Sequence, residues 1–476
     1  MQGLRKRRRV GALAIGVSLV AAMAGAGAAS ATTEPPPTEP ADTAAEDTTA
    51  PDASTPPGGS TAPGGGEVVR CGYAPSDVTG GAISGFAGTT PAGELTPEFF
   101  DRLCGINPEL EDLNYAPESY DAVVIIALAA EVAGTDGIEY ASEINGVTKG
   151  GTACTTFAEC RDLIAAGEDI DYNGASGPLE FDGNGEPLVA SYGLFKMGDN
   201  NRIDPALNEY IQVEGEPAYP EDVPVEGTRQ GDGVLTIGSI LPQTGSLAFL
   251  GPPEFAGVEL AIQEINEAGG VLGADVVSIP GDSGDTTTQQ ADQTVDRLLT
   301  ENVDAIIGAA SSSVTLTVID KITAAGVVMF SPANTSTELT AYDDNGLYFR
   351  TAPPDVYQGD VLGQFVINDG NQSVAIMNLN DSYGNSLAAQ AKATIEASGG
   401  EVVAEIVYDP AAASFDSEVD QLVAADADAV IVIGFNETSR ILRAMVESGI
   451  GPTTTAVYGC DGNIGNALGV DFDSGN

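Results

Sequence analysis

The sequence contains no histidine and no tryptophan. Because Ser-His-Asp and Cys-His mechanisms need an imidazole base, the missing histidine excludes these reaction types, along with zinc or haem sites that use histidine ligands. Residues 281–285 read GDSGD, a string that also occurs in serine proteases, but without a histidine base it predicts only a polar turn. The chain also lacks a glycine-rich phosphate loop. We therefore expect a protein that is not an enzyme and holds no cofactor.

Positive charge is scarce. The chain has 18 Lys and Arg residues against 70 Asp and Glu residues, which gives a formal net charge of −52. A field of this sign repels nucleic acid and anionic membranes, so neither is expected as a partner. The carboxylates are dispersed along the chain rather than clustered. This pattern favours solubility in an extracellular or salty medium over metal storage.

Long hydrophobic runs are also lacking, and no stretch approaches the ~18 uninterrupted apolar residues of a membrane span. Residues 10–24 are mostly apolar, follow the basic run 5–9, and precede Ala29-Ser30-Ala31. This arrangement predicts a signal peptide over 1–31, with a mature chain that starts at Thr32. No cysteine lies near the cleavage site, so a lipid anchor is not predicted. We expect a secreted, extracellular or cell-surface protein.

Export places the five cysteines in an oxidising compartment. Cys154 and Cys160 flank a short loop in TACTTFAEC and are predicted to form a disulfide. The remaining three, Cys71, Cys104 and Cys460, are an odd number, so two of them can pair and one is left free.

Two segments of biased composition divide the chain. Residues 32–66 are rich in Thr, Pro, Ala, Glu and Gly with almost no large apolar residue, and they predict a disordered tether. Residues 213–232 are acidic and contain several prolines, and they predict a linker. The folded blocks are therefore expected at 67–212 and 233–476.

Strands and helices alternate in the second block. The predicted strands are 234–241, 274–279, 304–308, 327–330, 373–379, 402–407 and 429–433. The predicted helices are 253–268, 286–301, 314–325, 356–368, 384–398, 416–425 and 437–448. Such alternation favours parallel sheets with helices on both faces. Two successive sets of these units predict two lobes, with the change between them near 350–354.

The first block predicts a different set of elements. A strand is expected at 83–86, and helices are expected at 96–104, 115–133 and 157–166. Residues 182–185 read DGNG between two strand-like runs. A hairpin turn is favoured there over an EF-hand, because the loop lacks the alternating carboxylates and the final Glu of a calcium loop.

Several strings, taken together, resemble one family. They are ILPQTG, AIQEINEAGGVLG, IIGAASSSVT, SPANTSTELT, YFRTAPPD, NDSYGNSLA and YGCDGNIGNALG in the second block, with AGTTP, SYDAVVIIALA and DYNGASGPLEFDGNGE in the first. These resemble the type I periplasmic binding proteins, in the branch of the leucine/isoleucine/valine-binding receptors of ABC importers. The resemblance implies an α/β fold of two lobes, each a parallel sheet flanked by helices, joined by hinge strands. It also implies a ligand cleft between the lobes and an ABC permease as partner.

The order of the two blocks departs from this resemblance. In the family the string that ends this chain is followed closely by the string that begins near Gly81, so the sequence looks like a circular permutant. An assembly error joining halves of two neighbouring receptors, or two unrelated domains, would be the alternatives. A permuted fold predicts that residues 470–476 lie beside 80–86. It also predicts that helix 118–133 packs on a sheet formed by strands 234–241, 274–279, 304–308 and 327–330.

The resemblance also implies a set of ligand-binding residues. The carboxylate of an amino acid would meet the loops after two neighbouring strands, at Ser311, Ser312, Ala333 and Thr335. Ordinary N-capping by Ser and Thr would explain these residue types without a ligand. Asp461 would meet the ammonium group, although the family often has Glu there. Other residues are expected to line the cleft: Tyr383, Phe435, Tyr115 and Glu118. Leu250 stands where relatives often have an aromatic residue, so the preferred side chain is not predicted.

The expected function is therefore that of an exported solute-binding protein, with an amino acid as ligand. A neutral amide or urea is an alternative ligand, because relatives bind these as well. A ligand-sensing surface receptor of the same fold is an alternative role.

Overall fold

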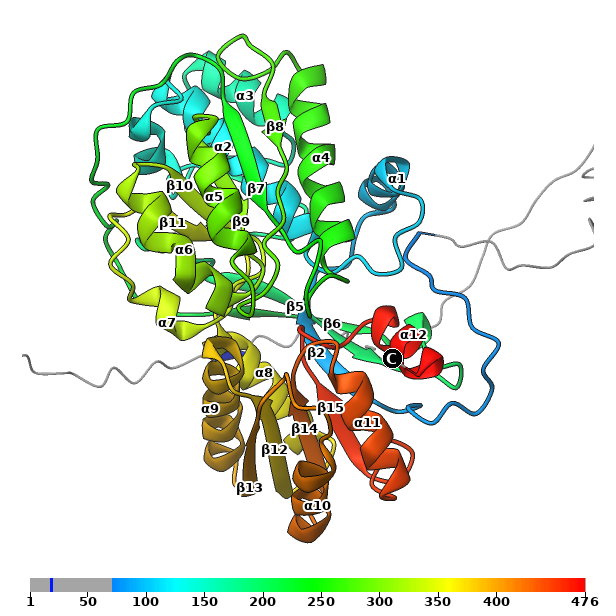
Figure 1. Ribbon diagram of the computed structural model, residues 1–476. Coiled ribbons are helices and arrows are strands. Elements are labelled where there is room, and N and C mark those ends of the chain that lie inside the picture. The colour runs from blue at the N-terminus through cyan, green and yellow to red at the C-terminus, as the bar shows by residue number, and fades with distance from the viewer. Residues whose placement is uncertain (1–17, 20–70, 476) are drawn as a thin grey trace, which may run out of the picture. The chain divides into compact units, whose positions relative to one another are not determined.

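The computed structural model describes residues 18–19 and 71–475, and these residues fold into two α/β lobes (Figure 1). Each lobe is built around one large sheet flanked by helices. The predicted tether at 32–66 and almost all of the predicted signal peptide lie outside the described residues. Both folded blocks of the sequence, by contrast, are described in full except for their outermost residues.

The first lobe contains a parallel sheet of five strands in the order β11-β10-β9-β7-β8. Its strands are β7 (Thr236–Ile240), β8 (Val277–Ile279), β9 (Ala305–Gly308), β10 (Val328–Ser331) and β11 (Tyr348–Arg350). The helices that connect them are α4 (Gly251–Glu267), α5 (Gln290–Thr300), α6 (Ser312–Ala324) and α7 (Thr337–Thr340). The carboxyl ends of β9 and β10 lead directly into the loops that were predicted to hold a carboxylate.

Helix α2 (Ala116–Ala133) comes from the first block but belongs to the core of this lobe. Every residue from Ala116 to Ala130 is buried, and the stretch from Ala122 to Ala130 is apolar on all sides, as expected for a buried helix. It packs along α4, and its apolar side chains share one core cluster with those of β7, β9 and β10. The predicted packing of this helix on the sheet is confirmed.

Part of the first block surrounds α2. It supplies α1 (Pro97–Ile106), α3 (Phe157–Ala166), the 3₁₀ helix η1 (Ile138–Glu143) and the short parallel pair β3 (Thr152–Cys154) and β4 (Ile170–Tyr172). In this structure Cys154 is bonded to Cys160 and Cys71 is bonded to Cys104. Cys460 is free and buried.

The second lobe contains a mixed sheet of eight strands in the order β1-β6-β5-β2-β15-β14-β12-β13. Its strands are β1 (Ser18–Leu19), β2 (Ala87–Pro91), β5 (Val189–Lys196), β6 (Glu209–Glu214), β12 (Ser373–Leu379), β13 (Glu401–Tyr408), β14 (Ala429–Ile433) and β15 (Ala456–Gly459). Its helices are α8 (Asp355–Asn368), α9 (Ser382–Ala397), α10 (Asp416–Ala425), α11 (Thr438–Glu447) and α12 (Asn466–Ser474), with the 3₁₀ turn η2 (Pro205–Leu207). Strands β2, β15, β14, β12 and β13 run parallel, whereas β5, β6 and β1 are added in antiparallel pairs.

The two blocks of the sequence meet in the middle of this sheet. Strand β15 from the end of the chain pairs in parallel with β2 from the first block. Asn201 joins the same two regions, since its side chain accepts from the Ile83 amide at 3.2 Å and donates to Asp473 at 2.7 Å. The predicted proximity of the chain end to residues 80–86 is therefore confirmed.

Some sequence-based expectations need correction. Residues 83–86 form a turn rather than a strand, because Gly85 has a φ of 89° and the Phe86 amide donates back to the Ile83 carbonyl. The strand begins one residue later, at Ala87. Helix α5 begins at Gln290 instead of 286, because the carboxylate of Asp285 accepts the Thr287 amide and holds the preceding residues in a turn.

Candidate functional site

The two predicted ligand loops follow adjacent strands and lie at the same edge of the first sheet. Ser311 is the N-cap of α6, and its Oγ accepts the Val314 amide at 3.4 Å. The alternative role as an N-cap is therefore realised for Ser311. Ser312 Oγ accepts the amide of Ser336 from the second loop at 3.3 Å, which ties the two loops together. These hydroxyls and the start of α6 can receive an anionic group.

One small cavity brings most of the predicted residues together. Its walls consist of residues from both lobes: Tyr115, Leu247, Leu250, Ala310, Ser311, Ser312, Ala333, Tyr383, Phe435, Asp461 and Gly462. Thr335 and Glu118 were predicted to line it but do not. The cavity volume is only about 10 Å³, which is the space that a single water molecule needs.

Asp461 follows β15 of the second lobe, whereas Ser311 and Ser312 belong to the first lobe, and its side chain is 4% exposed. Its Oδ2 accepts the Tyr115 hydroxyl at 2.6 Å, and its Oδ1 accepts the Tyr383 hydroxyl at 2.7 Å and Gln358 Nε2 at 2.8 Å. Burial raises the pKa of Asp461, while these donors act to lower it. All three donors are neutral, and the described residues that line the cavity include no Lys or Arg. The carboxyl is thus hydrogen-bonded but has no counter-charge.

Aromatic and aliphatic side chains form the apolar part of the cavity. The rings of Tyr383 and Phe435 stack with their centroids 5.5 Å apart and their planes within 9°. Leu247 and Leu250 face the same space from the start of α4. An aliphatic or small aromatic group of a ligand would bury its surface here.

Thr335 lies just outside the cavity, beside the start of α8. Its carbonyl accepts the Asp355 amide at 2.7 Å, and its hydroxyl lies near the Asp355 carboxyl. Burial raises the pKa of Asp355 to about 7, against the lowering effect of the hydroxyls of Ser386 and Thr335. Thr335 therefore contacts the first residue of α8, Asp355, in this structure.

Hydrogen bonds close the cleft at its rim. Ser313 Oγ donates to Asp381 at 3.2 Å, the hydroxyls of Ser336 and Ser382 are 2.8 Å apart, and the Thr337 amide donates to Ser386. Each pair joins the start of α6 or α7, or the N-cap of α7, in the first lobe to α9 or its N-cap in the other lobe. With so little free space inside, this is a closed arrangement.

Sequence reasoning missed Arg350, which donates hydrogen bonds to the second ligand loop, the loop after β10. Its Nη1 donates to the carbonyls of Asn334 and Ser336 at 3.1 and 3.0 Å, and its Nη2 pairs with Glu186 at 2.5 Å. The side chain is fully buried. The signal was present, because a lone arginine inside the apolar string YFR needs a buried partner.

None of the helices in the described ranges is both long enough and apolar enough to cross a membrane. Within the same ranges, no group of three or more acidic or cysteine side chains is arranged to hold a metal ion.

A closed cleft at the carboxyl ends of parallel strands, between two α/β lobes, is typical of a solute-binding protein. A family model described as "Periplasmic binding protein" matches residues 234–474, just over half of the sequence. The chain belongs to this family. A second model, "Receptor family ligand binding region", matches residues 59–200.

Curated relatives resemble part of the chain. A Leu/Ile/Val-binding protein homolog 3 from Brucella melitensis is 30% identical over 252 residues, covering 50% of this chain and 66% of the relative. The leucine-, isoleucine-, valine-, threonine-, and alanine-binding protein of Pseudomonas aeruginosa is 29% identical over 211 residues, covering 44% of this chain and 56% of the relative. The chemotactic signal transduction system substrate-binding protein BasB of Halobacterium salinarum is 29% identical over 208 residues, covering 42% of this chain and 50% of the relative. The chain thus spans between half and two thirds of the length of these relatives.

Solved structures give partial matches as well. The branched-chain amino acid transporter substrate binding protein LivJ from Streptococcus pneumoniae, in complex with isoleucine, is 27% identical with a TM-score of 0.43, covering 48% of this chain and 64% of that one. The leucine binding protein LivK from Thermotoga maritima is 24% identical with a TM-score of 0.44, over the same shares.

Proposed function

We propose that this chain is an exported substrate-binding protein of an ABC importer, and that it binds an α-amino acid between its two lobes. The observation that carries the proposal is the buried carboxyl of Asp461, which has neutral hydrogen-bond donors but no counter-charge. Ser311 and Ser312, at the start of α6 in the other lobe, line the same cavity. An ammonium group would pair with Asp461 and a carboxylate with these two serines.

The names of the relatives support this ligand class, since two of the three curated relatives are described as binding Leu, Ile and Val. The apolar wall of Tyr383, Phe435 and Leu250 suits an aliphatic side chain. A neutral amide or urea would leave the Asp461 charge unpaired, which makes these ligands the weaker candidates.

Ligand entry needs the lobes to separate. An amino acid is much larger than the cavity of about 10 Å³, so the rim contacts between Ser336 and Ser382 must open first. We infer that closure around the ligand creates the surface that an ABC permease recognises. Binding, rather than catalysis, is the activity expected of such a site.

Sensing is a second candidate role, because BasB belongs to a chemotactic signal transduction system. The same ligand cleft would serve either role. Transport requires a permease that docks on the closed form, whereas sensing requires a receptor. Co-purification of the exported chain with a permease, in the presence of ligand, would favour transport.

The family assignment and the contacts across β2 and β15 also support a circularly permuted chain. Because Asn201 bridges Ile83 and Asp473, a short connection from residue 475 to residue 80 would span a small gap. A rearranged protein with this connection, and with new ends opened within 213–232, is expected to fold and bind with unchanged affinity. Loss of folding in the rearranged protein would contradict the proposal.

A thermal-shift screen followed by calorimetry tests the function. The mature protein would be titrated with leucine, isoleucine, valine, threonine and alanine, and with urea and acetamide as neutral controls. One or more amino acids should raise the unfolding temperature through binding to the native state. A response to urea or acetamide alone would contradict the amino-acid proposal.

A further inference from the structure

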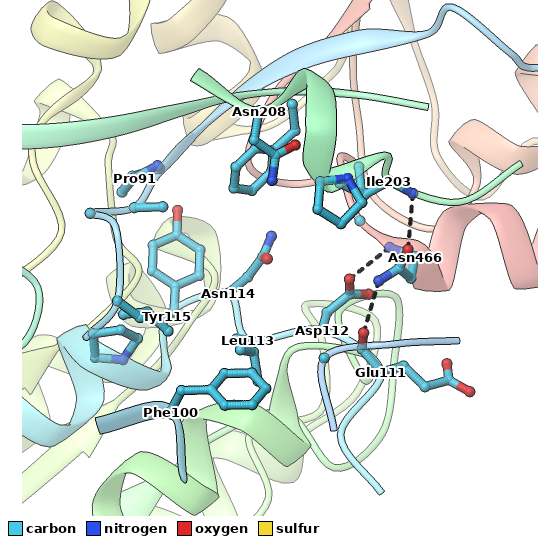
Figure 2. Close-up of a pocket in the computed structure, with 18 of the residues that line it drawn as sticks. Pro91, Phe100, Glu111, Asp112, Leu113, Asn114, Tyr115, Ile203, Asn208 and Asn466 are labelled. Atoms are coloured by element: carbon cyan, nitrogen blue, oxygen red, sulfur yellow. Dashed lines mark hydrogen bonds between the residues drawn. The ribbon is translucent and has the colours of Figure 1, made fainter. Parts of the chain in front are cut away.

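A second pocket lies on the other side of Tyr115 from the ligand cavity, and we name it the aromatic pocket. Its volume is about 190 Å³, far larger than the cavity in the cleft. Aromatic side chains from five segments line it: Tyr73, Phe100, Tyr115, Phe195 and Tyr210. Figure 2 shows Tyr115, Phe100, Asn114 and Asn208 around this space.

The charges at the aromatic pocket are all of one sign. Among the described residues that line it there is no Lys or Arg, whereas Glu111, Asp112 and Glu118 are present. Asp112 is already satisfied, because its oxygens accept the amides of Asn466 and Ala467 at 2.7 and 2.8 Å. The acidic side chains of the described lining therefore disfavour an anionic ligand.

Glu118 differs from Asp112 because one of its carboxyl oxygens lacks a partner. It is 3% exposed, and its Oε2 has no hydrogen-bond partner among the described residues. Glu254, at the start of α4, is fully buried, and neither of its carboxyl oxygens has a partner there. Neither residue forms an ion pair within the described part of the chain. Burial raises the pKa of Glu118 to about 8, and the charge of Glu118 adds to the rise of the pKa of Glu254.

An organic cation would be attracted by the aromatic rings and would also provide the counter-charge that the Glu118 carboxylate lacks. Aromatic faces attract an ammonium group through their quadrupole, and a buried carboxylate gains its missing counter-charge. We propose that the aromatic pocket binds an organic ammonium ion with an apolar body, and that Glu118 is its counter-charge. This site goes beyond the amino-acid cleft, with which it shares only the wall formed by Tyr115.

Three probes of equal ring size and different charge test the ligand class. Benzylamine, benzyl alcohol and benzoate carry a positive, zero and negative charge at pH 7, and their binding can be measured by calorimetry in 0.15 M salt. This salt screens the general field of the acidic protein beyond ~8 Å. Benzylamine is expected to bind about tenfold more tightly than benzyl alcohol, and benzoate is expected not to bind. Equal binding of benzylamine and benzyl alcohol, or absence of benzylamine binding, would overturn the proposal.

Matched variants locate the site. Glu118→Gln keeps the size of the side chain and removes its charge, so benzylamine affinity should fall about tenfold. Glu94→Gln, an exposed glutamate outside the pocket lining, should change nothing. Ala92→Phe fills the pocket and should abolish binding, whereas Ser311→Ala in the cleft should leave benzylamine binding intact.

The same variants also define the results that would contradict the proposed cation site. If Glu118→Gln and Glu94→Gln behave alike, or if Ala92→Phe binds benzylamine as the wild type does, the cation binds elsewhere and the proposal is wrong. Circular dichroism checks the fold of each variant. Should Glu118→Gln fail to fold, the probe series with Ala92→Phe decides the matter alone.

Discussion

The hydroxyl of Tyr115 lies 2.6 Å from Oδ2 of Asp461, although the two residues are 346 positions apart. Tyr115 precedes α2 in the first block, and Asp461 follows β15 near the chain end. One hydrogen bond thus joins the two blocks at the wall of the ligand cavity. Because the blocks share this site, neither of them holds all the residues that the proposed ligand would contact.

The first of the two predicted ligand loops, which contains Ser311, gives a first prediction. Ser311→Ala should weaken amino-acid binding about ten- to hundredfold, since one hydrogen bond to a charged group is lost. It should also cost about 1 kcal/mol of stability, because Ser311 caps α6. Thr317→Ala, which removes a hydroxyl from the same helix outside the cavity, is the matched control. Unchanged affinity in Ser311→Ala would remove this loop from the site.

Arg350 gives a second prediction, as a residue that positions the loop. Arg350→Gln should lower the free energy of unfolding by about 3–5 kcal/mol, because it leaves Glu186 buried without its partner. Lys321→Gln removes the surface ion pairs with Asp292 and Asp296 and should cost less than about 1 kcal/mol in urea unfolding.

A double variant separates support of the loop from general stability. Arg350→Met with Glu186→Leu removes both charges, so much of the stability should return. Amino-acid affinity should stay low, because the carbonyls of Asn334 and Ser336 still lack their donor. Full recovery of affinity in the double variant would show that Arg350 does not position the loop.

The sequence predicts most strands of the first sheet, but it does not predict contacts between residues that are far apart in the chain. The alternation of apolar runs predicted all strands of the five-stranded sheet except β11, because local periodicity decides such elements. Gln358 donates to Asp461 from 103 positions away, and no local pattern marks such a pairing. Strand β6 was missed for a similar reason, since most of its residues are exposed and it is stabilised by pairing with β5.

Buried carboxyl groups give a prediction about pH. Burial raises the pKa of Asp112, Asp304 and Asp344 to about 6 and that of Asp355 to about 7. The folded state therefore binds more protons than the unfolded state between about pH 4 and 7. Their contribution to stability is fully present below the unfolded pKa values and is lost as the pH rises through the folded ones.

The unfolding temperature should accordingly be higher at pH 5 than at pH 8, measured at constant ionic strength. Asp355→Asn should reduce this dependence, because it removes the group with the highest of these four pKa values. An unfolding temperature that rises between pH 5 and pH 8 would contradict the prediction.

The disulfides give a prediction about stability. In the chain-entropy account, the bridge between Cys71 and Cys104, which are 33 positions apart, contributes about 4 kcal/mol. The bridge between Cys154 and Cys160, six positions apart, contributes about 2 kcal/mol. Paired Cys→Ser variants, compared by urea unfolding, should follow this order, and the reverse order would contradict it.

Asp461→Asn tests the central claim most directly. The variant keeps the size of the side chain but removes the charge that would meet an ammonium group, so circular dichroism should show an unchanged fold. Calorimetry would use the amino acid that raises the unfolding temperature most, together with its analogue that lacks the amino group. The account predicts that Asp461→Asn loses affinity for the amino acid by at least about a hundredfold, and that the analogue binds poorly to the wild type. Equal binding of the amino acid to the wild type and to Asp461→Asn would contradict the account.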